Sequence, residues 1–212
     1  LQTDTDNFLL ETLEDSIFSA CSRIFSSKLI KSLGEDPFPI GDTYEEIATV
    51  PRLTLRAKSL FYLNASLLNY RVRANSITTT KTPKHCIDLA KSMGIFLQEL
   101  EIISNNKKLK IASNKISMKL FLAATRDCGL TPKRDYATYR KISEISKNNL
   151  SIPIKPIISE LKSSTKKSDK KDGTHLLFFS IAPTAFLISR KLIYSIKSKI
   201  NAAKHRLRII QK

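Results

Sequence analysis

The chain has few of the residues that characterise β-sheet proteins and disulfide frameworks. Among its 212 residues there is no Trp, aromatic residues make up 8% and Gly occurs only five times, a composition that argues against an all-β fold. The three cysteines, Cys21, Cys86 and Cys128, are odd in number, far apart and in no metal-ligand spacing. We therefore expect reduced, mostly buried thiols, a cytoplasmic or nuclear location and no metal site.

The sequence also lacks the motifs of the common catalytic sites. It has no Gly-rich phosphate loop, no Cys or His pair at ligand spacing and no Gly-x-Ser-x-Gly turn. His85 and Cys86 are neighbours, but adjacent residues of a helix point about 100° apart and would not pair as base and nucleophile. We therefore expect no enzymatic activity, no cofactor and no small-molecule substrate.

No signal peptide is visible in the sequence, which begins with Leu1 rather than Met, and we expect an N-terminal portion to precede it. The most apolar segment, residues 176–188, contains Pro183 and is too short to span a bilayer. We expect it to be a buried helix or a docking segment. With 42% apolar residues, the chain can fill a core of useful size.

Acidic residues are scarce in the second half of the chain. Residues 1–105 carry 11 basic and 13 acidic side chains, whereas residues 106–212 carry 25 basic and 6 acidic ones. The net charge of +17 therefore comes entirely from the second half. Such asymmetry indicates that the second half binds a polyanion while the first half contacts protein. The alternative is a basic surface that serves only solubility.

Two stretches have the spacing of a helix-turn-helix. In residues 83–105, Leu89 and Ala90 would lie on the inner face of a first helix, Gly94 at the turn and Leu100 in a second helix. A related pattern returns in residues 142–162, where Ile145 and Ser146 take the places of Leu89 and Ala90, and Leu150 that of Gly94. Apolar helices expected at 57–67 and 116–128 precede the two frames, so the repeated pattern predicts an all-α protein. We place two packed helical modules at 1–105 and 106–163, a mobile linker at 164–174 and a C-terminal segment at 175–212.

Apolar periodicity and helix breakers predict the remaining elements. We expect a Pro- and Gly-rich loop at 34–46 and polar connections at 71–83 and 105–115. The other expected helices are residues 6–33 with Asp4 or Asp6 as cap, 44–50, 52–70, 136–148, 153–163 and a long helix from Thr184 onward.

The sequences FLAATRDCG (Phe121 to Gly129) and DLAKSMGIFLQEL (Asp88 to Leu100) resemble the third helix and the last two helices of the cyclin-box repeat. This repeat forms the core of transcription factor IIB and of origin-recognition subunit six. The resemblance implies a nuclear protein of two cyclin-like modules that binds duplex DNA at a promoter or origin. It also implies a protein partner on the first module, such as the TATA-binding protein.

Carried over by position, the resemblance implies DNA contacts in and just before the second frame, at Ser151, Lys155, Lys162, Lys133, Arg134, Arg140 and Lys141. Lys and Arg would supply affinity for phosphate groups. Ser151, expected at the N-terminus of the recognition helix, would offer its amide to a phosphate.

The expected C-terminal helix is basic and amphipathic. Its apolar stripe consists of Ile193, Ile196, Ile200, Ala203, Leu207 and Ile210, and the residues Arg190, Lys197, Lys204, Arg206 and Arg208 lie off the stripe. Three interpretations fit such a helix: it lies along a nucleic-acid backbone, it lies on an anionic membrane surface, or it docks on the core with its basic side in solvent.

Two functional hypotheses of different classes follow from these patterns. The first is a DNA-binding module, similar to a general transcription factor, that bridges promoter DNA and protein. The alternative is a basic helical matrix or assembly protein that binds a membrane surface or a nucleocapsid. An interaction adaptor whose charge serves only solubility is the third and least specific hypothesis.

Overall fold

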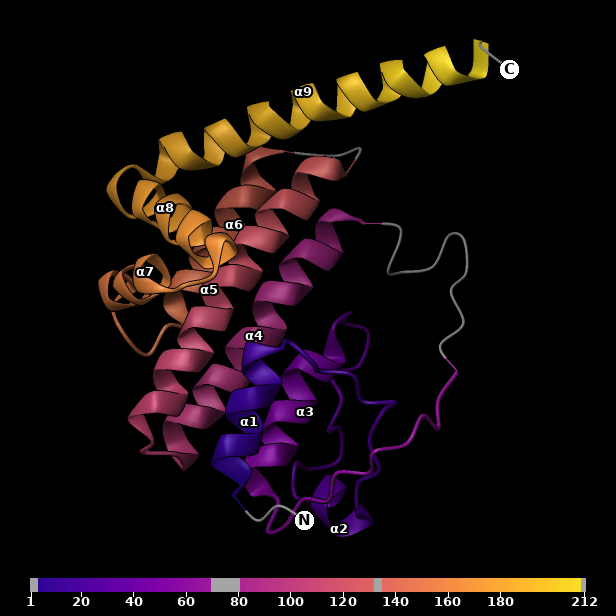
Figure 1. Ribbon diagram of the computed structural model, residues 1–212, viewed down its shortest axis with the longest axis vertical. Coiled ribbons are helices and arrows are strands. Elements are labelled where there is room, and N and C mark those ends of the chain that lie inside the picture. Colours follow the sequence, from indigo (N-terminus) through magenta and orange to yellow (C-terminus); the bar gives the residue numbers. More distant parts are fainter. Residues whose placement is uncertain (1–3, 70–80, 132–134, 211–212) are drawn as a thin grey trace.

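The computed structural model describes residues 4–69, 81–131 and 135–210, apart from the side chains of residues 202 and 204–210. In these residues it is built from helices without a β-sheet (Figure 1). The helices are α1 (Thr5–Glu14), α2 (Ser27–Lys31), α3 (Glu45–Arg56), α4 (Pro83–Ile103), α5 (Lys107–Leu130), α6 (Tyr136–Asn148), α7 (Ile154–Ser163), α8 (Lys167–Ile181) and α9 (Pro183–Ile210). The predicted all-α fold class is confirmed.

Helices α4 and α5 form the centre of the fold. They are joined by a short connection and pack along each other, and every other described helix except α2 packs against at least one of them. Thr82 caps α4 by accepting a hydrogen bond from the His85 amide (3.3 Å), and Asn106 caps α5 by accepting one from the Leu109 amide (3.2 Å). Such caps satisfy backbone groups that a helix end leaves unpaired.

A single hydrophobic cluster extends from Leu9 of α1 to Leu187 of α9. It includes Phe96 and Leu100 of α4 and Leu109 of α5, all of them buried. The module boundary expected between residues 105 and 106 therefore falls between two helices that share one core. Cys86 and Cys128 are buried in this cluster and Cys21 is exposed, and all three are free, as expected for mostly buried thiols.

The prediction of a helix-turn-helix in residues 83–105 is wrong, because α4 continues without interruption through Gly94. A Cβ atom at Gly94 would overlap the side-chain amide of Asn149, which follows α6. The Asn149 side-chain amide makes two hydrogen bonds. Its Nδ2 donates to the Ile145 carbonyl (2.7 Å), and its Oδ1 accepts from the Gln98 Nε2 (2.8 Å). The glycine therefore permits a close approach between α4 and the end of α6 rather than a turn.

The second frame does contain two helices at the predicted positions, α6 and α7, and Pro156 lies within the first turn of α7. The two helices do not pack against each other, however. Helix α7 packs on α8 and α5 instead. A helix-turn-helix requires its two helices to pack as a unit, so this arrangement is absent here as well.

In the N-terminal half, the predicted helix over residues 6–33 ends at Glu14, and Ser16 adopts a positive φ of 56°. Asp4 caps this helix, as expected. The helices predicted over 44–50 and 52–70 are one helix, α3, which ends at Arg56. Residues 57–69 are irregular, and Phe61 and Tyr62 are exposed. Because these apolar side chains stay in water, no burial offsets the cost of nucleating a helix there.

Two predicted connections are helical instead. Helix α5 begins at Lys107, within the basic stretch 105–115, because Asn106 caps the helix and Leu109 is buried. The expected mobile linker at 164–174 contains the start of α8 at Lys167. There Gly173 lies against α7, where an added Cβ would crowd Leu161 and Lys162. The loop predicted at 34–46 is present as far as residue 44, and α3 begins at Glu45. The connection expected at 71–83 lies largely outside the described residues.

Candidate functional site

Five of the nine basic residues that the structure describes in the first half pair with carboxylates. Arg52 pairs with Glu99 (2.6 Å) and Lys84 with Asp42 (3.2 Å). In the described part of the second half, by contrast, many lysines have no carboxylate within ion-pair distance. On α6 to α9 and the connection before α8 these are Lys141, Lys147, Lys155, Lys162, Lys166, Lys167, Lys170, Lys171, Lys191, Lys197 and Lys199. The end of the molecule built from α7, α8 and α9 is therefore its basic end.

The predicted DNA-contacting residues that the structure describes are divided among α6, the α6–α7 connection, α7 and α9. Lys155 and Lys162 are exposed on α7, whereas Lys141 is exposed on α6, which does not pack against α7. Arg140 pairs with Glu144 on the surface of α6 (2.8 Å). Lys133 and Arg134 lie outside the described residues, as do the side chains of Lys204, Arg206 and Arg208, although these three positions belong to α9.

The role expected of Ser151 is contradicted by its hydrogen bonds. Its amide donates to the Asn114 Oδ1 (3.0 Å), and its hydroxyl accepts from the Asn114 Nδ2 (2.7 Å). Helix α7 begins only at Ile154, with Pro153 at the cap position. The Ser151 amide is therefore occupied, and Ser151 ties the α6–α7 connection to α5 instead of facing a phosphate.

One face of α9 anchors this helix to the core. Phe186 and Leu187 are buried, and Tyr194 lies two turns farther along, 9% exposed, against Gly129 of α5. Their spacing places them on one side of the helix. Beyond this anchor, α9 extends past the body of the fold (Figure 1).

Arg190 belongs to the anchored face, although it was expected to lie on the solvated basic side. Its guanidinium lies over the Phe186 ring (4.8 Å to the centroid) and near the Tyr194 ring (5.9 Å). It also donates to the Tyr194 hydroxyl (3.3 Å) and is 3.2 Å from the His175 Nδ1 of α8. Burial lowers the pKa of His175, and the neighbouring Arg190 lowers it further. A neutral His175 can accept the hydrogen bond, so this cluster joins α8 to α9.

Beside this anchored face, α9 carries an apolar stripe that the described residues leave largely exposed. Ile193 is 45% exposed, Ile196 58% and Ile200 47%, and Leu192 beside them is 57% exposed. The predicted stripe therefore exists through Ile200, but it does not dock on the core. Lys197 and Lys199 are exposed among these residues. Ala203 is exposed too, while the side chains of Leu207 and Ile210 are not described.

The chain was compared with protein-family models, with curated proteins and with solved structures. No match was found. Within the residues that the structure describes, none of the helices combines the length and apolar character needed to cross a bilayer. In the same residues, no three His, Cys, Asp or Glu side chains gather as the ligands of a metal ion would.

The basic end is held to the central helices by a partly buried ion pair that sequence reasoning missed. Asp169 of α8 is 5% exposed and accepts from Lys119 of α5 (2.6 Å) and from the Ser164 hydroxyl (2.9 Å). Burial alone would raise the pKa of this carboxyl, but the hydrogen bonds outweigh burial and the pKa is lowered. In the sequence, Asp169 is one acid among lysines, which gives no signal of burial.

The lowered pKa of Asp169 predicts a loss of stability in acid. A group whose pKa is lower in the folded state contributes stability above its unfolded pKa, about 3.9 for Asp, and loses that contribution as the pH falls through the folded value. We expect Asp169→Asn to flatten the decline of the free energy of unfolding below about pH 4, measured by urea denaturation. Glu144→Gln, in an exposed pair, is the control and should leave the decline unchanged. An unaltered acid decline in Asp169→Asn would contradict the prediction.

Proposed function

We propose that the protein is a basic helical matrix or assembly protein that lies on an anionic membrane surface through α9. The observation that carries the proposal is the exposed stripe of Leu192, Ile193, Ile196 and Ile200 on a helix whose adjoining face is anchored to the core. A helix with an apolar stripe and flanking lysines is suited to lie in the plane of a membrane interface. Its lysines would then face anionic headgroups while its isoleucines enter the acyl boundary.

The apolar stripe favours a lipid surface over a nucleic-acid backbone. Lysines alone would suffice for phosphate contacts, and a phosphate backbone would leave the isoleucines in water. Burial of apolar area adds affinity for a lipid interface, and each Lys near an anionic leaflet adds about 1 kcal/mol. The DNA-binding hypothesis also depended on helix-turn-helix frames whose helices do not pack as such a unit. It becomes the competing outcome of the test below.

The experiment is co-sedimentation of the full chain with vesicles of phosphatidylcholine alone and with added phosphatidylserine. We expect binding to the anionic vesicles and weaker binding as salt is raised. The variant Ile193→Ser/Ile196→Ser should lower the partition coefficient roughly ten- to a hundredfold, because two large apolar side chains no longer enter the interface. Both positions are exposed, so the fold should tolerate the change.

The matched control is Ile102→Ser/Ile103→Ser, two exposed isoleucines at the end of α4. This variant should bind vesicles as the parent does. If the α9 variant also binds as the parent does, the proposal is wrong. Nucleic acid takes the place of the membrane if, in addition, alanine at Lys141, Lys155 and Lys162 weakens duplex DNA binding. The slope of the logarithm of the DNA-binding constant against the logarithm of the salt concentration should then decrease in magnitude by about 0.9 for each phosphate group that these lysines no longer neutralise.

A further inference from the structure

An open groove runs between α7 and α8, on the basic end of the molecule. Its apolar lining consists of Ile154 and Ile158 from α7 and of Leu177 and Ile181 from α8, and its volume is about 750 Å³. Each pair is spaced by one helical turn, so the four side chains form two parallel ridges. Ile158 is 6% exposed at the bottom, whereas Ile181 is 74% exposed at the rim.

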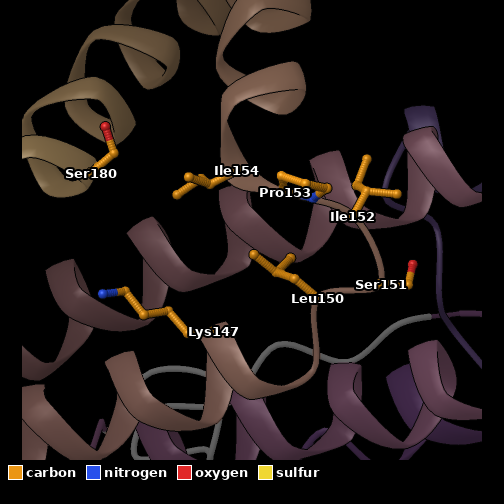
Figure 2. Close-up of a pocket in the computed structure, with 7 residues that line it drawn as sticks. All are labelled: Lys147, Leu150, Ser151, Ile152, Pro153, Ile154 and Ser180. Carbon is orange, nitrogen blue, oxygen red and sulfur yellow. The ribbon is translucent and has the colours of Figure 1, made fainter.

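A second hollow of about 480 Å³ continues this groove toward the α6–α7 connection. Figure 2 shows the residues that line it, with Lys147 of α6 on one side and Ser180 of α8 on another. The two hollows share Ile154 and Ser180. Leu150 and Ile152 extend the apolar lining. Together the hollows make one elongated apolar depression.

The charged side chains that line this depression all have one sign. Lys155 and Lys162 line the groove and Lys147 the adjoining hollow, and neither is lined by a carboxylate. Lys155 and Lys162 have no ion-pair partner among the described residues. The remaining polar side chains of the lining are serines: Ser159, Ser163 and Ser180 in the groove, and Ser151 in the adjoining hollow. An occupant with acidic flanks would therefore be favoured over a neutral or basic one.

We propose that this groove docks an acidic amphipathic helix of a partner protein. Apolar residues of the partner at i, i+3 or i+4, and i+7 would lie along the two ridges, which is how an amphipathic helix fills a hydrophobic groove. Asp and Glu on its flanks would face Lys155 and Lys162. The protein contact then lies in the basic half of the chain, not in the near-neutral first half where the cyclin-box resemblance placed it.

Three other occupants fit the groove less well. A flat lipid surface does not reach Ile158 at the bottom of a concave groove, and a nucleic-acid backbone would leave the isoleucines unpaired. The exposed apolar helix of a second copy, α9, carries Lys197 and Lys199 and would be repelled by the groove lysines. This inference does not rest on the membrane proposal, because the groove and the α9 stripe share no residue.

The test uses a fluorescent synthetic helix of about 18 residues, or five turns, with a leucine stripe and Glu at the flanking positions. A second peptide has the same stripe with Lys in place of every Glu. By fluorescence anisotropy, we expect the acidic peptide to bind the full chain roughly tenfold or more tightly than the basic one. The variant Lys155→Glu/Lys162→Glu should reverse this preference. Both lysines are exposed, so the fold should persist, which circular dichroism checks.

Lys141→Glu, on the exposed face of α6, is the matched charge control and should leave the preference intact. Ile193→Ser/Ile196→Ser should leave peptide binding intact too, and a loss there would place the peptide on α9 and overturn the proposal. Equal binding of the two peptides, or an unchanged preference in Lys155→Glu/Lys162→Glu, would also overturn it. The proposal would be equally wrong if Lys155→Glu/Lys162→Glu lost its binding to vesicles or to DNA but kept its preference for the acidic peptide.

Discussion

Replacing Phe179 with Ala is expected to lower the free energy of unfolding by about 3–5 kcal/mol. Phe179 of α8 is 1% exposed, and its ring centroid lies 4.7 Å from that of Phe121 in α5 and 5.5 Å from that of Phe186 in α9. The ring therefore joins the basic end to the central helices, and its removal leaves a cavity where three helices meet. For a chain of this size we expect the Tm to fall by roughly 10 °C.

The neighbouring Phe178 provides the matched control. It is 43% exposed and touches only the edge of Phe186 among the described rings (5.7 Å). Phe178→Ala should therefore cost less than half as much, measured by urea denaturation under the same conditions. Equal losses for the two variants would mean that α8 does not present Phe179 to the core.

The sequence predicted helices best where local signals decide the outcome. Helix α6 has the predicted bounds, because Asp135 caps it, accepting from the Thr138 amide (2.6 Å), and its apolar residues repeat with helical spacing. The long α9 begins at Pro183, where a proline is tolerated in the first turn. The charge asymmetry also predicted that the basic surface belongs to the second half.

The sequence failed where distant residues decide the outcome. Gly94 can be a turn or a point of close helix contact, and only the position of Asn149 distinguishes the two. Charged residues near position 169 are typical of a linker, yet Asp169 is buried in α8, where it accepts hydrogen bonds from Lys119 and Ser164. Arg190 has the periodicity of a solvated residue, but His175 comes from another helix. In each case the missing information is a tertiary contact, not a local propensity.

The same distinction applies to the candidate surfaces. Ile193, Ile196 and Ile200 were predicted as one stripe from their spacing, which a helix preserves wherever it lies. That the stripe remains uncovered depends on where Phe186 and Leu187 anchor the helix. The groove could not be predicted, because one of its walls, α8, begins within the stretch expected to be a linker.

Replacing Gly129 with Ala should loosen α9 from the body of the protein. Gly129 lies in the last turn of α5, and an added Cβ would overlap the Cβ of Tyr194. That atom is bonded directly to the backbone of α9, so the overlap is relieved only if the helix moves. Overpacking of this kind costs about 1–3 kcal/mol, and the gain of about 1 kcal/mol in helix propensity offsets only part of it. We expect a lower free energy of unfolding and faster amide hydrogen exchange along α9.

Gly94→Ala separates the steric effect from helix propensity, because both glycines lie within helices. At Gly94 the obstacle is the end of the Asn149 side chain, which can rotate at the cost of its hydrogen bonds. This variant should therefore lose less stability and leave hydrogen exchange in α9 unchanged. If Gly129→Ala behaves as Gly94→Ala does, α9 is not seated on α5 through Tyr194. Tyr194 is not part of the exposed stripe. The variant Gly129→Ala should therefore keep its affinity for anionic vesicles even though α9 is loosened. That result would distinguish the anchoring face of α9 from its proposed membrane face.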